Sequence, residues 1–409
     1  MVNETNSLSF RHYFLLWFGA AVSVAEILAG GLLAPLGSFD GLSAILIGHF
    51  FGASLLVLGG IIGVRERVGA IASTRISFGI YGARIFGMIN VLQLVGWTAI
   101  MIISAARSAN EITKTLWNID SYFGWSIGIG GLIMLWLALG RESGWKKMNA
   151  ASVALLFGLT VVLSAVLVKE IGANAAPVTG GLTFGEGVEL SVVMPLSWLP
   201  LIADYTRFAR STRGAAIGSW LGYFIGSCWM YIIGLGAALL TGSADPAGVM
   251  LAANLGMAAL GIIVLATVTT TFMDAYSAGV SFSTLIPGLN EKYIALIMTA
   301  VGTVLALVVK MEQYEHFLLA IGSVFAPLFA VLLTDYFILG KRSAEGGLLA
   351  NWNALAVWAV GVALYYQFLK LDMMLGATVP VIAVTGLLHV IVGRLGIRWT
   401  YCQKSRKSW

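Results

Sequence analysis

The chain has 409 residues, of which 59% are hydrophobic and 11% are charged, and its formal net charge is +5. A soluble domain carries roughly 25% charged residues, so this composition excludes a soluble protein and indicates an integral membrane protein. The two cysteines, Cys228 and Cys402, exclude a disulfide or metal framework, and membrane topology explains the positive charge without a nucleic-acid partner.

A helix needs about 20 apolar residues to cross a bilayer, and by this criterion the chain holds about twelve spans. The predicted spans are 14–36, 42–64, 85–106, 124–140, 149–168, 188–206, 214–240, 257–283, 294–309, 316–339, 352–370 and 374–393. A short helix outside the membrane is expected at 247–256. No basic segment with a cleavage site precedes the first span, which argues against a signal peptide. Residues 1–409 are therefore expected to form a single all-α, multi-pass transmembrane domain.

The basic residues predict that both termini lie in the cytoplasm, with the protein in the inner (cytoplasmic) membrane. With that orientation, 19 of the 24 Lys and Arg residues fall on the inside and five on the outside. The five outside residues are Arg107, Lys114, Lys169, Lys310 and Lys370. This skew follows the positive-inside rule. Short loops and an even number of spans favour a transporter over a receptor or an enzyme.

The first span, 14–36, is interrupted by small residues and carries an acid. Gly19, Gly30 and Pro35 mark the interruptions, and Glu26 lies well inside the span with no basic residue on the same helix. Ionisable residues inside a bilayer are costly and functional by default. Glu26 is therefore a candidate to bind an amino group of a ligand or to carry a proton. The alternative is a neutral carboxyl group that nearby backbone satisfies.

The third span, 85–106, places two side chains on one helix face. Gln93 and Trp97 are four residues apart and therefore neighbours on a helix surface. A carboxamide both donates and accepts hydrogen bonds, and an indole offers a flat apolar surface. The pair suits a planar heterocycle with polar edges. The alternative is a packing tryptophan beside a glutamine that faces a neighbouring helix.

The sixth span, 188–206, contains Pro195 and Pro200 on either side of Ser197 and Trp198. Each proline removes a backbone donor and clashes with the preceding turn. Within a bilayer, broken helix is tolerated only where it is buried in protein or lines a cavity. The sequence therefore predicts half of a transport site here. Asp204 lies one turn before Arg207, which predicts a local ion pair.

The eighth span, 257–283, carries the run Ala266–Thr271 and, one turn later, Asp274. Threonine hydroxyls and unwound carbonyls supply the oxygen ligands that a hard cation prefers. The alternative is that the hydroxyls bond back to their own helix. Asp274, like Glu26, lies inside its span with no basic neighbour on the same helix, so it is a second candidate for ligand binding or proton transfer.

Other ionisable residues receive structural interpretations. His49 and His389 are lone histidines in apolar spans and are expected to be satisfied packing residues. Glu189 lies near the outer end of its span and is expected to reach water. Asp335 precedes Lys341 and is expected at the interface.

The first and sixth spans, both interrupted by glycine or proline, lie five spans apart, as inverted repeats of five helices predict. The expected repeats are 14–168 and 188–339, followed by two extra helices at 352–393.

The segment Ala203–Arg210, with the sequence ADYTRFAR, is similar to the Asp-Phe-Thr-Arg-Phe signature that follows the sixth helix in the nucleobase:cation symporter-1 family. The chain resembles this family of cytosine, hydantoin, allantoin and purine permeases over most of its length. Further agreement comes from Gly30-Gly31, Gly96-Trp97, Thr269-Thr270, Ala326-Pro327 and Asp335-Tyr336.

The resemblance implies a LeuT-like fold, with two inverted five-helix repeats plus two helices and a substrate site between the first, third, sixth and eighth helices. Trp97 matches the stacking tryptophan of the family, with Gln93 one turn away, and Ser197 and Trp198 fall in the broken sixth helix. Ser23 stands where some relatives have glutamine. Pro195 stands where some have an aromatic residue. The implied sodium ligands are carbonyls of Gly19, Val22 and Ala266 and hydroxyls of Thr269 and Thr270.

Within the family, the chain most resembles the hydroxymethylpyrimidine permeases of thiamine salvage. The expected function is import of this small aminopyrimidine by sodium symport with alternating access, with no covalent cofactor. One alternative is a proton-coupled permease for cytosine or another nucleobase, with Glu26 or Asp274 as the proton carrier. A passive channel is a more remote alternative, and the sequence contains no cluster that indicates an enzyme.

Overall fold

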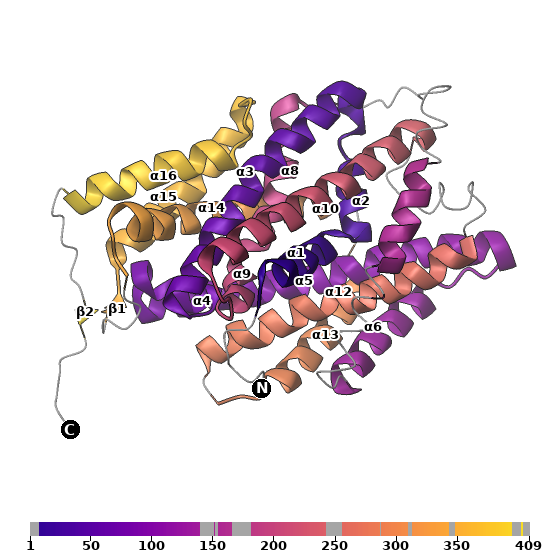
Figure 1. The fold of residues 1–409 in the computed structure, drawn as a ribbon, viewed down its shortest axis with the longest axis horizontal. Coiled ribbons are helices and arrows are strands. Elements are labelled where there is room, and N and C mark those ends of the chain that lie inside the picture. Colours follow the sequence, from indigo (N-terminus) through magenta and orange to yellow (C-terminus); the bar gives the residue numbers. More distant parts are fainter. Residues whose placement is uncertain are drawn as a thin grey trace.

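The computed structural model describes residues 8–139, 151, 154–165, 181–242, 256–286, 288–309, 313–342, 348–394 and 402–403. Figure 1 shows a bundle of long helices. Within the described ranges, nine helical runs are long and apolar enough to cross a membrane, and Ala154–Ala165 and Thr378–Arg394 are shorter apolar helices. The helix expected at 247–256 lies almost wholly outside the described residues.

The helices follow the predicted order of spans. The first half contains α1 (Phe10–Ala21), α2 (Val24–Gly31), the 3-10 turn η1 (Ala34–Leu36), α3 (Gly37–Glu66), α4 (Ala70–Ser73), α5 (Arg75–Trp117), α6 (Tyr122–Leu139) and the helix Ala154–Ala165. The second half contains α8 (Phe184–Ser197), α9 (Leu199–Thr206), α10 (Thr212–Thr241), α12 (Gly256–Leu285), α13 (Glu291–Val308), α14 (Tyr314–Leu333) and the π-helical turn η3 (Thr334–Ile338).

The last elements are β1 (Leu348–Ala350), α15 (Trp352–Phe368), the 3-10 turn η4 (Leu369–Leu371), α16 (Thr378–Arg394) and β2 (Cys402–Gln403). The two short strands pair in antiparallel fashion. In Figure 1, α15 and α16 lie side by side at one edge of the bundle, far from α6 and α13.

The first span is two helices, with a break at Val22 and Ser23. The backbone of Ser23 is extended, and its side chain caps α2 by accepting a hydrogen bond from the N–H of Glu26. A serine at this position satisfies a helix N-terminus that has no preceding turn. The residues predicted as an interrupted span therefore form a discontinuous helix.

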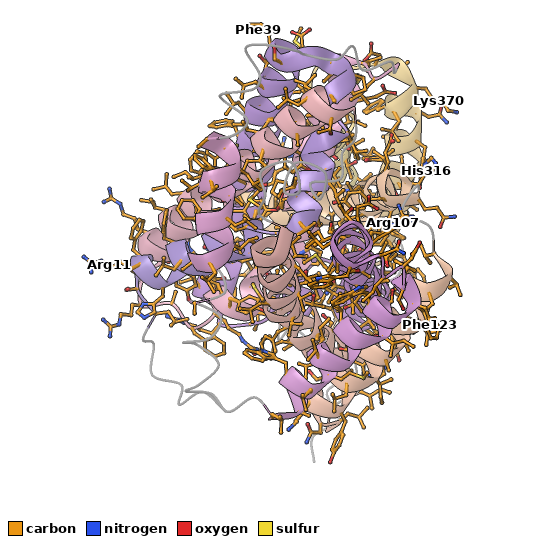
Figure 2. The ribbon with its side chains drawn as sticks, turned by 90° about the vertical axis from the view of Figure 1, so that its right-hand side faces the viewer. Arg11, Phe39, Arg107, Phe123, His316 and Lys370 are labelled. Atoms are coloured by element: carbon orange, nitrogen blue, oxygen red, sulfur yellow. The ribbon has the colours of Figure 1, made fainter. Side chains whose placement is uncertain are left out.

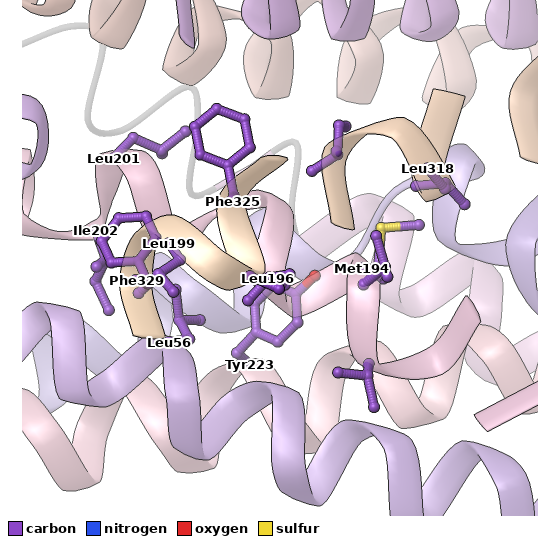
Figure 3. Packing of buried hydrophobic residues seen from close by; sticks show 14 of the residues in the cluster. Leu56, Met194, Leu196, Leu199, Leu201, Ile202, Tyr223, Leu318, Phe325 and Phe329 are labelled. Atoms are coloured by element: carbon purple, nitrogen blue, oxygen red, sulfur yellow. The ribbon is translucent and has the colours of Figure 1, made fainter. Parts of the chain in front are cut away.

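The sixth span also breaks, at Trp198, between α8 and α9. Pro195 lies in the last turn of α8, and Pro200 lies in the first turn of α9, where a missing N–H is tolerated. Figure 3 shows this region packed among buried side chains, including Leu56 of α3 and Phe325 of α14. The break predicted from the two prolines is confirmed and is enclosed in protein, as a bilayer requires.

Glycines let α2 and α10 approach closely. A Cβ atom at Gly30 would overlap the backbone of Tyr231, and one at Gly234 would overlap the carbonyl of Ile27. Small residues at such crossings allow the backbones of membrane helices to touch.

Gly234→Ala is expected to destabilise the fold by about 1–3 kcal/mol, the usual cost of overpacking a well-packed interior. Thermal unfolding in detergent measures the effect. Gly128→Ala is the matched control, because a Cβ there meets no atom within 4 Å. Equal unfolding temperatures for the two variants would contradict the close packing of α2 and α10.

Glu189 anchors the last two helices to α8. Its Oε1 accepts hydrogen bonds from the hydroxyls of Tyr365 and Thr378, and its Oε2 accepts one from the N–H of Thr378 at 2.7 Å. The side chain is buried. The expectation that Glu189 reaches water is wrong, because α15 and α16 cover the end of α8.

Two other acids also have buried partners. Asp204 accepts a hydrogen bond from the N–H of Ala70 at 3.0 Å, and the ion pair expected with Arg207 is not among the ion pairs of the described residues. Asp335 pairs with Lys341 at 2.7 Å and contacts His389 at 2.8 Å. The side chain of Asp335 is fully buried, whereas that of Lys341 is 45% exposed, so Asp335 lies beneath a side chain that reaches the surface.

The outer surface of the bundle carries large apolar side chains. Phe39 and Phe123 are 80% and 64% exposed, and Figure 2 shows both at the periphery. Such exposure fits a surface that faces lipid, where an apolar side chain is not penalised.

Candidate substrate and ion site

A small cavity lies where the two broken helices meet α5 and α12. Its lining residues are Ser23, Ala25, Glu26, Trp97, Met101, Met194, Ser197, Trp198, Leu201, Thr270 and Asp274. The structure thus brings together six of the eight predicted substrate residues. Four different spans contribute them, and these are the first, third, sixth and eighth spans that the resemblance implies.

Two tryptophans give the cavity flat apolar walls. The ring of Trp97 on α5 meets the rings of Tyr314 and Phe317 of α14 edge-on, at centroid distances of 6.1 and 5.5 Å. Trp198 meets Trp17 of α1 edge-on at 5.8 Å. These edge-on contacts fix the ring planes. The two indoles are therefore held by aromatic neighbours from α1 and α14.

Two acids line the same cavity. Oε1 of Glu26 accepts a hydrogen bond from the hydroxyl of Tyr223 at 2.8 Å, and Oε2 lies within hydrogen-bond distance of the hydroxyl oxygen of Ser227, at 2.6 Å. Asp274 on α12 is 4% exposed. No lysine or arginine is among the described residues of the lining. The polar edge of the cavity therefore suits a ligand that donates hydrogen bonds.

Gln93 lies behind the cavity wall. Its Nε2 donates to the carbonyl of Ser197 at 2.9 Å and to Oδ1 of Asn90 at 3.2 Å. Asn90 in turn donates to the hydroxyl of Ser281 at 2.8 Å. Gln93 therefore holds the broken end of α8 against α5. Its Oε1 has no hydrogen-bond partner among the described residues.

Pro195 does not line the cavity. Its ring faces Gly52 of α3, where a Cβ atom would overlap it. Pro195 therefore interrupts α8 on the face that packs against α3, away from the cavity. Three residues in or beside the cavity, Asn90, Trp17 and Met101, were not predicted from the sequence. Asn90 lies one turn before Gln93 on the same helix face, a signal that was available.

The break between α1 and α2 frees two of the backbone carbonyls predicted to bind sodium. In a continuous helix, the carbonyl of Gly19 would accept from Ser23 N–H, and that of Val22 from Glu26 N–H. Here Ser23 N–H donates to Ala21 at 2.9 Å, and Glu26 N–H donates to the Ser23 hydroxyl. Both carbonyls therefore lose their usual helix donors, which suits cation ligands in a discontinuous helix.

The other predicted ligands lie on α12. Thr270 is buried and lines the cavity. Thr271 donates to the carbonyl of Thr267 at 2.7 Å, so its hydroxyl is used within the helix. Of Ala266 and Thr269 the structure describes the helical backbone and not the side chains.

The cavity is small in this conformation. About 20 Å³ is open to the centres of water molecules, which is room for about one water. Tyr314 of α14 contacts the lining residue Ala25, because its hydroxyl donates to the carbonyl of Ala25 at 3.2 Å. A heterocycle therefore requires these side chains to separate.

A small cavity between two discontinuous helices, inside a polytopic helical bundle, defines a secondary transporter. The family model described as "permease for cytosine/purines, uracil, thiamine, allantoin" matches residues 2–393. The chain belongs to this family, and it is a transporter rather than an enzyme.

Individual relatives agree with this assignment. The chain is 26% identical to the cytosine permease of Escherichia coli K12 over 365 residues, which cover 87% of this chain and 84% of the relative. It is 22% identical to the hydantoin permease of Microbacterium maritypicum, covering 94% and 84% of the two chains. Among solved structures, Mhp1, a nucleobase-cation-symport-1 family transporter in a closed conformation with bromovinylhydantoin bound, matches with a TM-score of 0.80 at 20% identity. That match covers 95% of this chain and 92% of Mhp1. The predicted LeuT-like fold is confirmed.

Proposed function

We propose that this permease imports a small aminopyrimidine, hydroxymethylpyrimidine in the first place, by sodium symport. The observation that carries the proposal is the composition of the cavity, in which Trp97 and Trp198 accompany the carboxyl groups of Glu26 and Asp274. Indole rings stack on planar heterocycles. A carboxylate accepts hydrogen bonds from an exocyclic amino group and from a hydroxymethyl group. It would repel the oxygen atoms of a heterocycle that carries carbonyl groups instead.

The sodium part of the proposal rests on the break in the first span. The carbonyls of Gly19 and Val22, freed from their helix donors, and the hydroxyl of Thr270 are the supporting ligands. A cation between α1 and α12 would stabilise the same arrangement of helices that encloses the substrate. Ion and substrate that favour one state bind cooperatively, which is the basis of coupling.

Uptake of labelled hydroxymethylpyrimidine into vesicles tests the proposal. Accumulation is expected with an inward sodium gradient and is expected to collapse when potassium replaces sodium. Absence of uptake under both conditions would contradict the substrate. Uptake that does not respond to sodium would contradict the coupling ion.

A second candidate is a proton-coupled permease for cytosine, favoured by the two buried acids of the cavity. Cytosine also carries an exocyclic amino group, but it has a ring carbonyl as well. Competition by unlabelled cytosine, and uptake driven by an imposed pH gradient without sodium, would favour this second function.

A further inference from the structure

A chain of three hydrogen-bonding groups leads from the cavity into the interior of the bundle. Oε2 of Glu26 lies 2.6 Å from the hydroxyl oxygen of Ser227 on α10, and this oxygen lies 2.6 Å from Nε2 of His49 on α3. Nδ1 of His49 lies 2.9 Å from the carbonyl oxygen of Ile45. All three side chains are buried. Only Glu26 lines the cavity.

Counting hydrogens shows that this chain holds an extra proton. The carbonyl of Ile45 carries no hydrogen, so Nδ1 of His49 must carry one, and a neutral imidazole then has a bare Nε2. The Ser227 hydroxyl has one hydrogen and two short contacts. The second contact needs a hydrogen from the Glu26 carboxyl or from a protonated His49. A carboxylate beside a neutral histidine cannot make both contacts.

The neutral arrangement satisfies every donor. Glu26 as a carboxylic acid donates to Ser227, Ser227 donates to His49, and His49 donates to Ile45. Tyr223 donates to the other carboxyl oxygen at 2.8 Å. Burial of separated charges in an apolar interior is costly, so this conformation favours the proton on Glu26.

We propose that Glu26, Ser227 and His49 form a one-proton relay that converts Glu26 from a neutral acid to a carboxylate when a hydrogen-bond-donating heterocycle enters the cavity. The O–H bond of Glu26 breaks as an O–H bond forms on Ser227. The original O–H bond of Ser227 breaks as an N–H bond forms on Nε2 of His49. The products are a carboxylate that faces the ligand and an imidazolium at His49, with no change in net charge.

The other titratable groups around Glu26 come from three helices. They are Tyr223, Cys228 and Tyr231 of α10, Tyr314 of α14 and Asp274 of α12. None of these carries a positive charge, and the ring of His49 lies against that of Tyr231 at 4.5 Å. Among the described groups of this cluster, His49 is therefore the base that can receive the proton.

The relay deepens the proposed function, because it gives a reason why an amino group is preferred over a carbonyl. The carboxylate of Glu26 accepts hydrogen bonds from N–H groups of the ligand. Glu26 becomes a neutral acid again when the ligand leaves. The relay and the proposed substrate are nevertheless separable, because the extra proton is present before any ligand binds.

Infrared spectra of the purified full-length protein test the relay. The ligand-free wild type is expected to show the carbonyl stretch of one protonated carboxylic acid that Glu26→Gln lacks. Glu186→Gln, at an exposed helix cap that glutamine can also fill, is the matched control and should leave the signal unchanged. If Glu26→Gln fails to fold, Ser227→Ala should shift the same signal, because it removes the 2.6 Å contact. Absence of any acid signal attributable to Glu26 would overturn the proposal.

Adding hydroxymethylpyrimidine or cytosine tests the transfer. The acid signal is expected to fall in the wild type and to persist in His49→Gln, which keeps an acceptor for Ser227 but cannot take a proton. An acid signal in the wild type that neither compound changes would overturn the ligand-driven transfer. If the wild type does not take up hydroxymethylpyrimidine but its acid signal still falls with cytosine, only the proposed substrate is contradicted.

Discussion

Trp97→Ala is expected to weaken substrate binding roughly five- to hundredfold while leaving the fold intact. Stacking of a base on an aromatic side chain contributes about 1–3 kcal/mol, and about 1.4 kcal/mol corresponds to a tenfold change in affinity. Trp97 lines the cavity, and Tyr314 and Phe317 hold its ring plane. The concentration dependence of uptake, or quenching of tryptophan fluorescence by hydroxymethylpyrimidine, measures the loss.

Trp220→Ala is the matched control for Trp97. Trp220 lies on α10, stacks on Phe224 at 4.7 Å and donates to Ser54, and it is absent from the cavity lining. Its replacement removes the same indole without touching the proposed site. Equal losses of affinity in the two variants would show that Trp97 acts through general packing. Trp97→Phe should recover part of the affinity, because a smaller ring still stacks.

The breaks in the membrane helices could be predicted from the sequence because their causes are local. Pro195 and Pro200 affect only their own turns, and the structure places the break between them, at Trp198. In the first span, glycines and a proline indicated an interruption, but the position of the break at Val22 and Ser23 was not specified. Serine is a common helix cap, and this signal at Ser23 could have located the break.

Cavity residues could be predicted from the sequence where one helix carries them. The hydrogen bonds behind the cavity, which join different helices, could not. Gln93 and Trp97 share a face by spacing alone, and Trp97 lines the cavity while Gln93 lies behind its wall. His49 and Ser227, by contrast, are 178 residues apart in sequence, and Ser227 and Glu26 are 201 residues apart. No local sequence pattern indicates hydrogen bonds between residues so far apart, so His49 was interpreted as a packing residue. It is satisfied, as expected, but its partner connects it to Glu26.

Depth along a span was a poor guide to burial. Glu189 lies close to the end of its predicted span, which suggested contact with water, yet α15 and α16 supply Tyr365 and Thr378 as its donors. His389 of α16 likewise covers Asp335, a contact that the interpretation of His389 as a lone packing residue did not include. In both cases, helices that come later in the chain pack over the end of an earlier one, and a span-by-span analysis does not include that packing.

Thr270→Val is expected to raise the sodium concentration that half-activates uptake by about tenfold or more. Valine keeps the shape of threonine and removes the hydroxyl oxygen, and loss even of a group that only supports a metal ligand costs roughly 10–100-fold in metal affinity. Substrate affinity at saturating sodium should change little, because Trp97 of α5 and Trp198 at the junction of α8 and α9 keep the stacking walls. Uptake measured over a series of sodium concentrations, with the ionic strength held constant by choline, gives both values.

Thr271→Val provides the comparison from the adjacent residue. Its hydroxyl donates to the carbonyl of Thr267 within α12, so the same chemical change removes a hydrogen bond that a helix does not require. Its sodium dependence should match that of the wild type. If Thr271→Val alters the sodium response as much as Thr270→Val does, the effect belongs to the helix rather than to a ligand oxygen. An unaltered response in both variants would place the coupling ion away from α12 and would leave the carbonyls of Gly19 and Val22 without their proposed partner.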